Sequence, residues 1–69
     1  MFNREKLSEY LKENKITQLG FAKQLGVTEG AIRHIVVGIK QPSLDMTIRI
    51  AQFMGCTVND LVIIPTEEE

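Results

Sequence analysis

The stretch that most constrains the fold runs from Gln18 to Val37 and reads QLGFAKQLGVTEGAIRHIVV. Gly26 interrupts it, and because glycine adopts a positive φ angle readily, a first helix is expected to end there. Thr28 then stands where its side chain can accept a backbone N–H and begin a second helix. The small Ala22 lies in the first helix, where a larger side chain would push the second helix away. The stretch therefore predicts two short helices that cross closely.

The apolar residues of this stretch recur at the spacing that fixes both helices to a common core. They are Phe21, Leu25, Val27, Ile32 and Ile35. The opposite side of the second helix is left free to contact another molecule. This is the helix-turn-helix arrangement, in which the second helix enters the DNA major groove. The sequence thus predicts a DNA-binding regulator.

Length and composition limit the other possibilities. Sixty-nine residues form one small domain, and a hydrophobic fraction of 43% is too high for a disordered chain. Cys56 is the single cysteine, which excludes an internal disulfide and a multi-cysteine zinc site and fits a reducing compartment. No apolar run approaches the ~20 residues of a membrane span, and no signal-peptide pattern opens the chain. We expect a soluble, cytoplasmic protein with no membrane partner.

The net charge of −1 lacks the basic bias that is common among nucleic-acid binders. Three of the nine acidic residues are the terminal Glu67, Glu68 and Glu69, so eight basic residues face six acidic ones over residues 1–66, a balance of +2. We interpret residues 1–66 as the domain and residues 67–69 as a solvated acidic tip. The alternatives for the tip are repulsion of wrongly oriented DNA or binding of a basic partner. The weak charge predicts modest non-specific affinity for DNA.

Cap and turn residues divide the chain into five helical segments, so the predicted fold is an all-α compact bundle of five short helices. The fourth helix is expected to turn Leu44, Ile48 and its other apolar residues toward the core. An apolar strip over residues 62–65 follows the last helix. The expected helices are a first one from an Asn3 cap to about Asn14, Gln18 to Leu25 after a Thr17 cap, Glu29 to about Val37, Leu44 to Met54 after a Ser43 cap, and a short helix after Thr57, whose pairing with Asp60 resembles a capping box.

Three motifs, ITQLGFAKQLGVT, AIRHIVVG and PSLDMTIRIAQFMGCTVNDLV, resemble the Cro- and lambda-repressor-like helix-turn-helix family, also called the XRE family. They stand in the family's order and at its separations, and the resemblance covers residues 7–62. It implies a compact bundle of four or five helices that binds double-stranded operator DNA, typically as a homodimer.

The resemblance also implies roles for individual residues. Gln18 and Thr28 match positions that contact phosphate, and residues 38–40 match the loop that lies along the DNA backbone. Lys23, on the exposed side of the second helix, and Lys40 are further candidates for backbone contact. The positions that reach base edges are matched by Glu29, Gly30, Arg33 and His34, and the expected loop contacts are at Gly38 and Lys40.

Several residues depart from the family pattern. Gly20 stands where glutamate or alanine is common, and it destabilises a helix by about 0.5–1 kcal/mol relative to alanine. Val36 and Val37 replace a Glu-Arg pair, and the loop carries one basic residue, Lys40. Gly30 removes a side chain from a position that faces bases. These departures affect the operator sequence and the affinity rather than the fold.

The candidate base contacts each have a structural alternative. The Arg33 guanidinium can pair with O6 and N7 of guanine, or it can bind a phosphate. The Glu29 carboxylate can accept from cytosine N4, or it can simply favour the positive end of the helix dipole. Gly30 either permits close approach of DNA or is merely tolerated.

No enzyme, metal or cofactor is predicted. His34 could donate to a base or phosphate, but its helix-spaced neighbours, Gly30, Arg33 and Gly38, are not metal ligands. No nucleophile and carboxylate stand at a recognisable catalytic spacing. Cys56 is expected to be a buried thiol rather than a redox sensor. Arg4 and Lys15 are expected to be solvated.

The leading hypothesis is therefore a sequence-specific operator-binding regulator, with no small-molecule ligand expected. The alternative is a protein-interaction module, such as an antitoxin or anti-repressor, built on the same fold. The acidic balance, the two valines before Gly38 and the strip over residues 62–65 lean toward that alternative. The strip is expected either to pack on its own domain or to form a two-fold interface. We favour a homodimer through Val62, Ile63 and Ile64, since one recognition helix contacts few base pairs.

Overall fold

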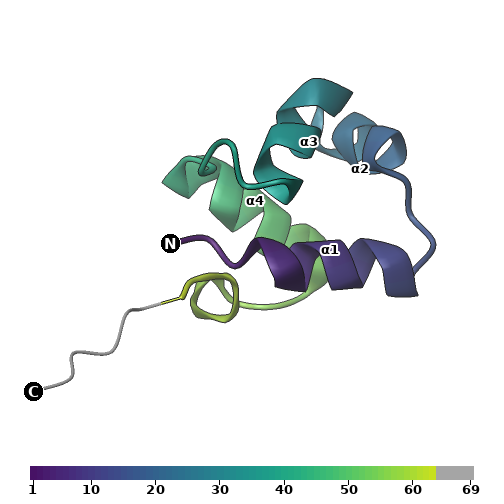
Figure 1. Ribbon diagram of the computed structural model, residues 1–69. Coiled ribbons are helices and arrows are strands. Elements are labelled where there is room, and N and C mark those ends of the chain that lie inside the picture. Colours follow the sequence, from purple (N-terminus) through teal and green to yellow (C-terminus); the bar gives the residue numbers. More distant parts are fainter. Residues whose placement is uncertain (64–69) are drawn as a thin grey trace, which may run out of the picture.

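The computed structural model describes residues 1–63, which form a small helical bundle (Figure 1). Over these residues the only strand-like pairing is one isolated antiparallel bridge, so the all-α prediction is confirmed. None of the helices in this range is both long and apolar enough to cross a bilayer. The elements are α1 (Arg4–Glu13), α2 (Gln18–Leu25), α3 (Glu29–Val36), α4 (Leu44–Met54) and the 3-10 helix η1 (Val58–Leu61).

Each helix is preceded by an N-cap residue whose side-chain oxygen accepts a hydrogen bond from the backbone N–H three residues further along. Such a bond satisfies one of the N–H groups that have no partner within the helix. The donor–acceptor distances lie between 3.0 and 3.4 Å, and all five predicted caps are confirmed. The capping residues are Asn3, Thr17, Thr28, Ser43 and Thr57.

The core lies where α1, α2, α3 and α4 meet, and η1 packs against α4 and α1. The Phe53 ring meets Phe21 edge-on at 5.1 Å between centroids and Tyr10 at 6.5 Å. These aromatic contacts join α4 to α2 and α1. The buried apolar residues are Phe2, Leu7, Leu11, Phe21, Ala22, Leu25, Ile32, Ile35, Ile50, Ala51 and Leu61.

Helix α4 differs from the prediction in the face that it buries. Leu44 is 69% exposed and Ile48 is 37% exposed, so their expected place in the core was wrong. Thr47 is buried instead, which is possible because its hydroxyl donates to the Ser43 carbonyl at 2.8 Å. That local bond removes the penalty for burying a polar group and lets the helix turn its other edge inward. The buried residues of α4 are Thr47, Ile50 and Ala51.

The fifth helix is a single 3-10 turn rather than an α-helix. The predicted capping box is present, because the Thr57 N–H donates to the Asp60 carboxylate at 3.1 Å while the Thr57 hydroxyl oxygen accepts from the Asp60 N–H. Val62 already has extended backbone angles, so the chain has no room for a further helical turn.

The two ends of the described chain pair with each other, in an arrangement that we call the terminal closure (residues 1–3 with residues 61–63). Phe2 and Val62 form the antiparallel bridge, and the Asn3 N–H donates to the Leu61 carbonyl at 2.7 Å. The Ile63 N–H donates to the Met1 carbonyl at 2.6 Å. The Val62 backbone is therefore paired with the first residues of its own chain.

Of the remaining residues of the apolar strip over residues 62–65, the structure describes only Ile63. The Ile63 side chain is 46% exposed. Ile64, which we named as a dimerisation residue, lies outside the described residues, as does the acidic tip over residues 67–69.

Candidate nucleic-acid interface

The turn between α2 and α3 fixes the crossing of the two helices. Gly26 has φ +74° and ψ +30°, the left-handed conformation that glycine adopts without strain from a Cβ atom. The Val27 N–H returns to the Ala22 carbonyl at 3.0 Å, and the Arg49 guanidinium of α4 donates to the Leu25 carbonyl. The last turn of α2 is therefore tied both to the connection and to α4.

Helix α3 is buried along one side only. Ile32 and Ile35 are buried, and Ala22 of α2 is fully buried, so the two helices approach closely without a large side chain between them. Arg33 and His34 are exposed on the other side of the helix. A helix packed on one side and polar on the other has the form needed to enter a groove.

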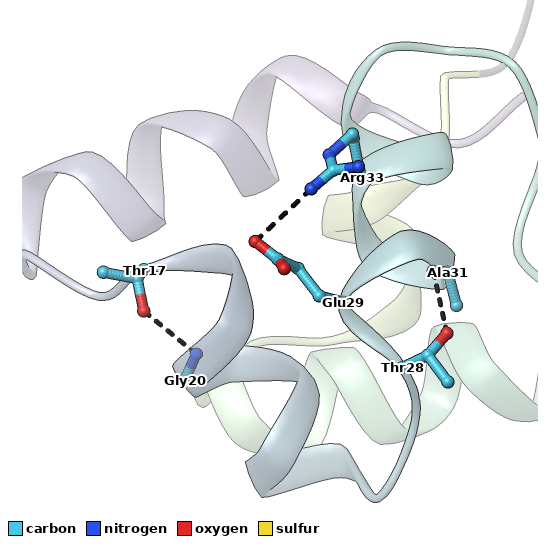
Figure 2. A network of polar contacts seen from close by, with 6 residues as sticks. All are labelled: Thr17, Gly20, Thr28, Glu29, Ala31 and Arg33. Atoms are coloured by element: carbon cyan, nitrogen blue, oxygen red, sulfur yellow. Dashed lines mark hydrogen bonds and ion pairs between the residues drawn. The ribbon is translucent and has the colours of Figure 1, made fainter.

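The four predicted base-contact residues fall into two groups. Glu29 and Arg33 form an ion pair at 3.5 Å, and their side chains are 42% and 55% exposed. Figure 2 shows both side chains leaving α3 on the side where α2 begins, marked by Thr17 and Gly20. The pair has the favourable order of an acid four residues before a base. Because it is exposed, it adds at most about 1 kcal/mol to stability and can open when another partner arrives.

Gly30 and His34 belong to a different part of the surface, an open groove of about 460 Å³ beside α3. The groove runs from α3 across the connection to the start of α4, and its lining is mainly apolar. Lys40, whose N–H donates to the His34 carbonyl at 3.1 Å, contributes from the connection, and Met46 contributes from α4. The lining residues are Thr28, Gly30, Ala31, His34, Ile35, Lys40, Gln41, Pro42, Ser43 and Met46.

The predicted backbone-contact residues are distributed around α2 and α3. Gln18 is the first residue of α2 and is half-buried, while Lys23 is exposed on the same helix. Thr28 is exposed and accepts the Ala31 N–H at 3.2 Å, so its side chain already caps α3 (Figure 2). Gly38 and Lys40 are exposed in the connection to α4. The starts of α2 and α3 therefore both present capped N-termini near the exposed side of α3.

Arg4 was predicted to be solvated, and it is exposed, but it also makes a contact that the sequence did not indicate. Arg4 Nη1 donates to the Val36 carbonyl at the end of α3 at 3.2 Å. A second contact links the same parts of the chain, because the Phe2 N–H donates to Gln41 Oε1 at 2.7 Å. Sequence analysis missed both contacts, since residues 32 and 39 positions apart share no local pattern.

Comparison with known proteins shows the family. The helix-turn-helix family model matches residues 7–61, which is most of the chain. This chain belongs to the helix-turn-helix family. An uncharacterized HTH-type transcriptional regulator of Methanocaldococcus jannaschii is 35% identical to it over 65 residues, covering 94% of this chain and 98% of that protein. No solved structure gives a significant match. The predicted resemblance to the XRE-type helix-turn-helix proteins is confirmed.

Two further groups of this helix-turn-helix protein lie away from α3. Cys56 is half-buried and packs against the core, and residues 1–63 contain no cluster of three or more His, Cys, Asp or Glu side chains arranged to hold a metal ion. The pKa of Asp60 is lowered, chiefly by the hydrogen bond from the Thr57 backbone N–H and next by the Thr57 hydroxyl. These bonds stabilise the carboxylate, so this group serves the fold of η1.

Proposed function

We propose that this helix-turn-helix protein is a sequence-specific, double-stranded-DNA-binding transcriptional regulator that inserts α3 into the major groove of an operator. The observation that carries the proposal is the two-sided character of α3. Ile32 and Ile35 anchor one side in the core, and Arg33 and His34 are exposed on the other. Family membership and the similarity to the Methanocaldococcus jannaschii transcriptional regulator support the same function.

Within this proposal, Arg33 is the principal base contact. Its guanidinium can bind O6 and N7 of guanine in a bidentate manner once it leaves Glu29. Glu29 then has two roles that the ion pair supports: it orients Arg33 in the free protein, and it repels sequences that offer no donor. Gly30 and His34 face the groove, where Gly30 leaves room for a base and His34 supplies a donor.

The backbone contacts surround this helix. The N–H groups at the starts of α2 and α3 point along the helix axes and favour phosphate, aided by Gln18 and Thr28. Lys23 and Lys40 supply the positive charge on either side. Gly38 and Lys40 place the connection to α4 along the DNA strand.

We further propose that the protein acts as a homodimer on a two-fold site. Half-sites one DNA turn apart double the number of base pairs that are read. The interface would involve Val62, Ile63 and Ile64, of which the exposed Ile63 offers apolar surface among the described residues. The exposed pair Leu44 and Ile48, four residues apart on α4, offers more. Sedimentation of the protein with its selected duplex should give two chains per duplex, and one chain per duplex would contradict the dimer.

A second candidate is the protein-interaction module. It is favoured by the exposed apolar residues at the end of α3, because Val37 is 50% exposed and Ile39 is 68% exposed. Exposed apolar side chains such as these are typical of a protein–protein contact rather than of a surface that binds phosphates and base edges.

Selection from a random-sequence duplex library tests the proposal against this candidate. A DNA-binding regulator should enrich one short site, with two-fold symmetry if it binds as a dimer. Failure to enrich any sequence at low salt would contradict DNA recognition and favour the interaction module.

Arg33→Ala tests the assignment of the recognition helix on the enriched site. It should weaken binding by about 1–3 kcal/mol and relax preference at one base pair in each half-site. Lys12→Ala, an exposed change at the end of α1, is the control and should leave the preference unchanged. If Arg33→Ala weakens all sequences equally, Arg33 binds a phosphate instead.

A further inference from the structure

Arg4 forms a hydrogen bond with a backbone carbonyl at the C-terminal end of α3. The last four carbonyls of a helix have no partner within the helix. Three of these accept from the following turn: the Val37 N–H donates to Arg33, the Gly38 N–H to Ile35, and the Ile39 and Lys40 N–H groups to His34. The remaining carbonyl, of Val36, accepts from Arg4 Nη1 at 3.2 Å. Arg4 therefore completes the hydrogen bonding at the end of the recognition helix.

The position of Arg4 also suits its charge. The C-terminal end of a helix carries partial negative charge, so a guanidinium there is favourable. Gly38 shows how closely the arginine approaches the chain, because a Cβ atom at that residue would lie 2.9 Å from Arg4 Nε. Gly38 has φ +88°, and it carries the chain from α3 into the connection that holds Lys40.

Gln41 anchors the other end of the same connection. Its Oε1 accepts the Phe2 N–H at 2.7 Å, and Phe2 is only 6% exposed and is bridged to Val62. Residues 38–40 are thus held at one end by Arg4 and at the other by Gln41. Phe2 belongs to the terminal closure, and Arg4 follows that segment directly, with its N–H donating to the Phe2 carbonyl at 3.1 Å.

We infer that Arg4 and Gln41 are positioning residues for DNA binding, which hold residues 38–40 and the end of α3 in the orientation that meets the DNA backbone. This inference rests on the proposed function. Arg4 acts through the connection that carries Lys40, rather than by contacting phosphate itself. Gln41 does the same from the other end of that connection.

Arg4→Met removes the donor and the charge while retaining a long side chain. We expect the affinity of the full chain for its enriched duplex, measured by fluorescence anisotropy, to fall about tenfold, the equivalent of one charge-assisted hydrogen bond. Arg4→Lys should recover part of this loss. Gln41→Met, which removes the acceptor of the Phe2 N–H, should weaken binding in the same direction. Lys12→Met is the control for loss of one positive charge on α1, and it should bind like the parent.

A double-mutant cycle separates positioning from direct contact. If Arg4 acts through the connection, Arg4→Met should weaken binding by less than about threefold in a Lys40→Ala background, because the contact that it positions is already gone. Amide hydrogen exchange at residues 38–40 of the free protein should also rise in Arg4→Met while the thermal midpoint changes little.

Three outcomes overturn the inference. In the first, the losses of affinity from Arg4→Met and Lys40→Ala add, and Arg4→Met lowers the slope of log affinity against log salt concentration by about one. This result would make Arg4 a phosphate contact. Equal binding by Arg4→Met and the parent would leave it without a role in recognition. If the unsubstituted chain selects no duplex, the proposed function fails first and the inference falls with it, whatever the exchange at residues 38–40 shows.

Discussion

The α2–α3 unit and the terminal closure are held together by different forces. In the α2–α3 unit, three fully buried side chains, Phe21, Ala22 and Ile32, meet within twelve consecutive residues. The terminal closure joins residues about 60 positions apart, and its backbone hydrogen bonds include two at 2.6 and 2.7 Å. One region depends mainly on packing between neighbours in sequence, the other on pairing between the two ends of the chain.

The difference shows how a chain of this size can keep its recognition helix in place. Local packing sets the angle between α2 and α3, and the N–H groups of residues 37–40 bond back to the last turn of α3, but these local bonds leave the Val36 carbonyl without a partner. Arg4 supplies that partner, and Gln41 ties the connection to Phe2 of the terminal closure. The two regions therefore meet at Gly38, beside the surface that we assign to DNA.

The largest expected change in stability comes from replacing a phenylalanine with alanine, once in the α2–α3 unit and once in the terminal closure. Phe21→Ala should lower the free energy of unfolding by about 3–5 kcal/mol, because the Phe21 side chain of α2 is fully buried and packs on Phe53 of α4. Phe2→Ala should lower it by less, since the chain end can open locally while the other helices stay packed. Urea unfolding followed by circular dichroism measures both values.

Amide hydrogen exchange extends this comparison to single residues. In Phe2→Ala, exchange should rise at Asn3 and Ile63 before it rises in α2 and α3. Equal losses of stability, with exchange rising everywhere at once, would show that the two regions unfold as one unit.

Alanine substitutions at Gly38 and Gly30 are expected to change stability in opposite directions, by smaller amounts. Gly38→Ala should destabilise the protein by about 1–2 kcal/mol, because φ is +88° and the new Cβ would meet Arg4. Gly30→Ala should stabilise it by about 0.5–1 kcal/mol, because a Cβ there meets nothing within 4 Å and alanine favours the helix. Thermal unfolding of the two variants measures the signs directly.

The DNA affinity of Gly30→Ala then decides between the two interpretations of that glycine. A more stable variant that binds its operator less tightly would mean that Gly30 makes room for DNA. A more stable variant with unchanged affinity would mean that the glycine is only tolerated. A destabilised Gly30→Ala would contradict the open space beside α3.

Most of the fold was predictable because its determinants are local. Each cap accepts a hydrogen bond from only three residues away, and Gly26 and Gly55 end their helices by adopting positive φ angles. The left-handed Lys15, φ +56°, was not predicted, because lysine gives no signal for that conformation. Periodicity also failed to choose the buried edge of α4, where Thr47 replaced Leu44 and Ile48 once its hydroxyl had a local acceptor.

The candidate site divides in the same way. The exposure of Arg33 and His34 followed from helical spacing, whereas the ion pair between Glu29 and Arg33 was not predicted. The partners of Arg4 and Gln41 were not predicted either, because a hydrogen bond between distant segments depends on how the whole chain folds back. Spacing alone could not show that Gly30 and His34 share a groove with Lys40 and the start of α4.

The smallest expected effect is a pH dependence of η1 and of the terminal closure that follows it. The pKa of Asp60 is lowered by its hydrogen bonds from Thr57, so its carboxylate stabilises the native state above about pH 4 and loses this effect as the pH falls through the lowered pKa. Asp60→Asn should therefore be less stable than the parent at pH 7, and the difference should narrow below pH 4. Urea midpoints between pH 7 and pH 2.5 measure this difference, with Glu9→Gln on α1 as the control for loss of one carboxylate. Because η1 ends at Leu61 and Val62 follows it directly, amide exchange at low pH should rise at residues 61–63 before α2 and α3 respond. A constant difference at every pH would show that Asp60 stabilises η1 without its charge, and early exchange in α3 would show that the closure and the recognition helix open together.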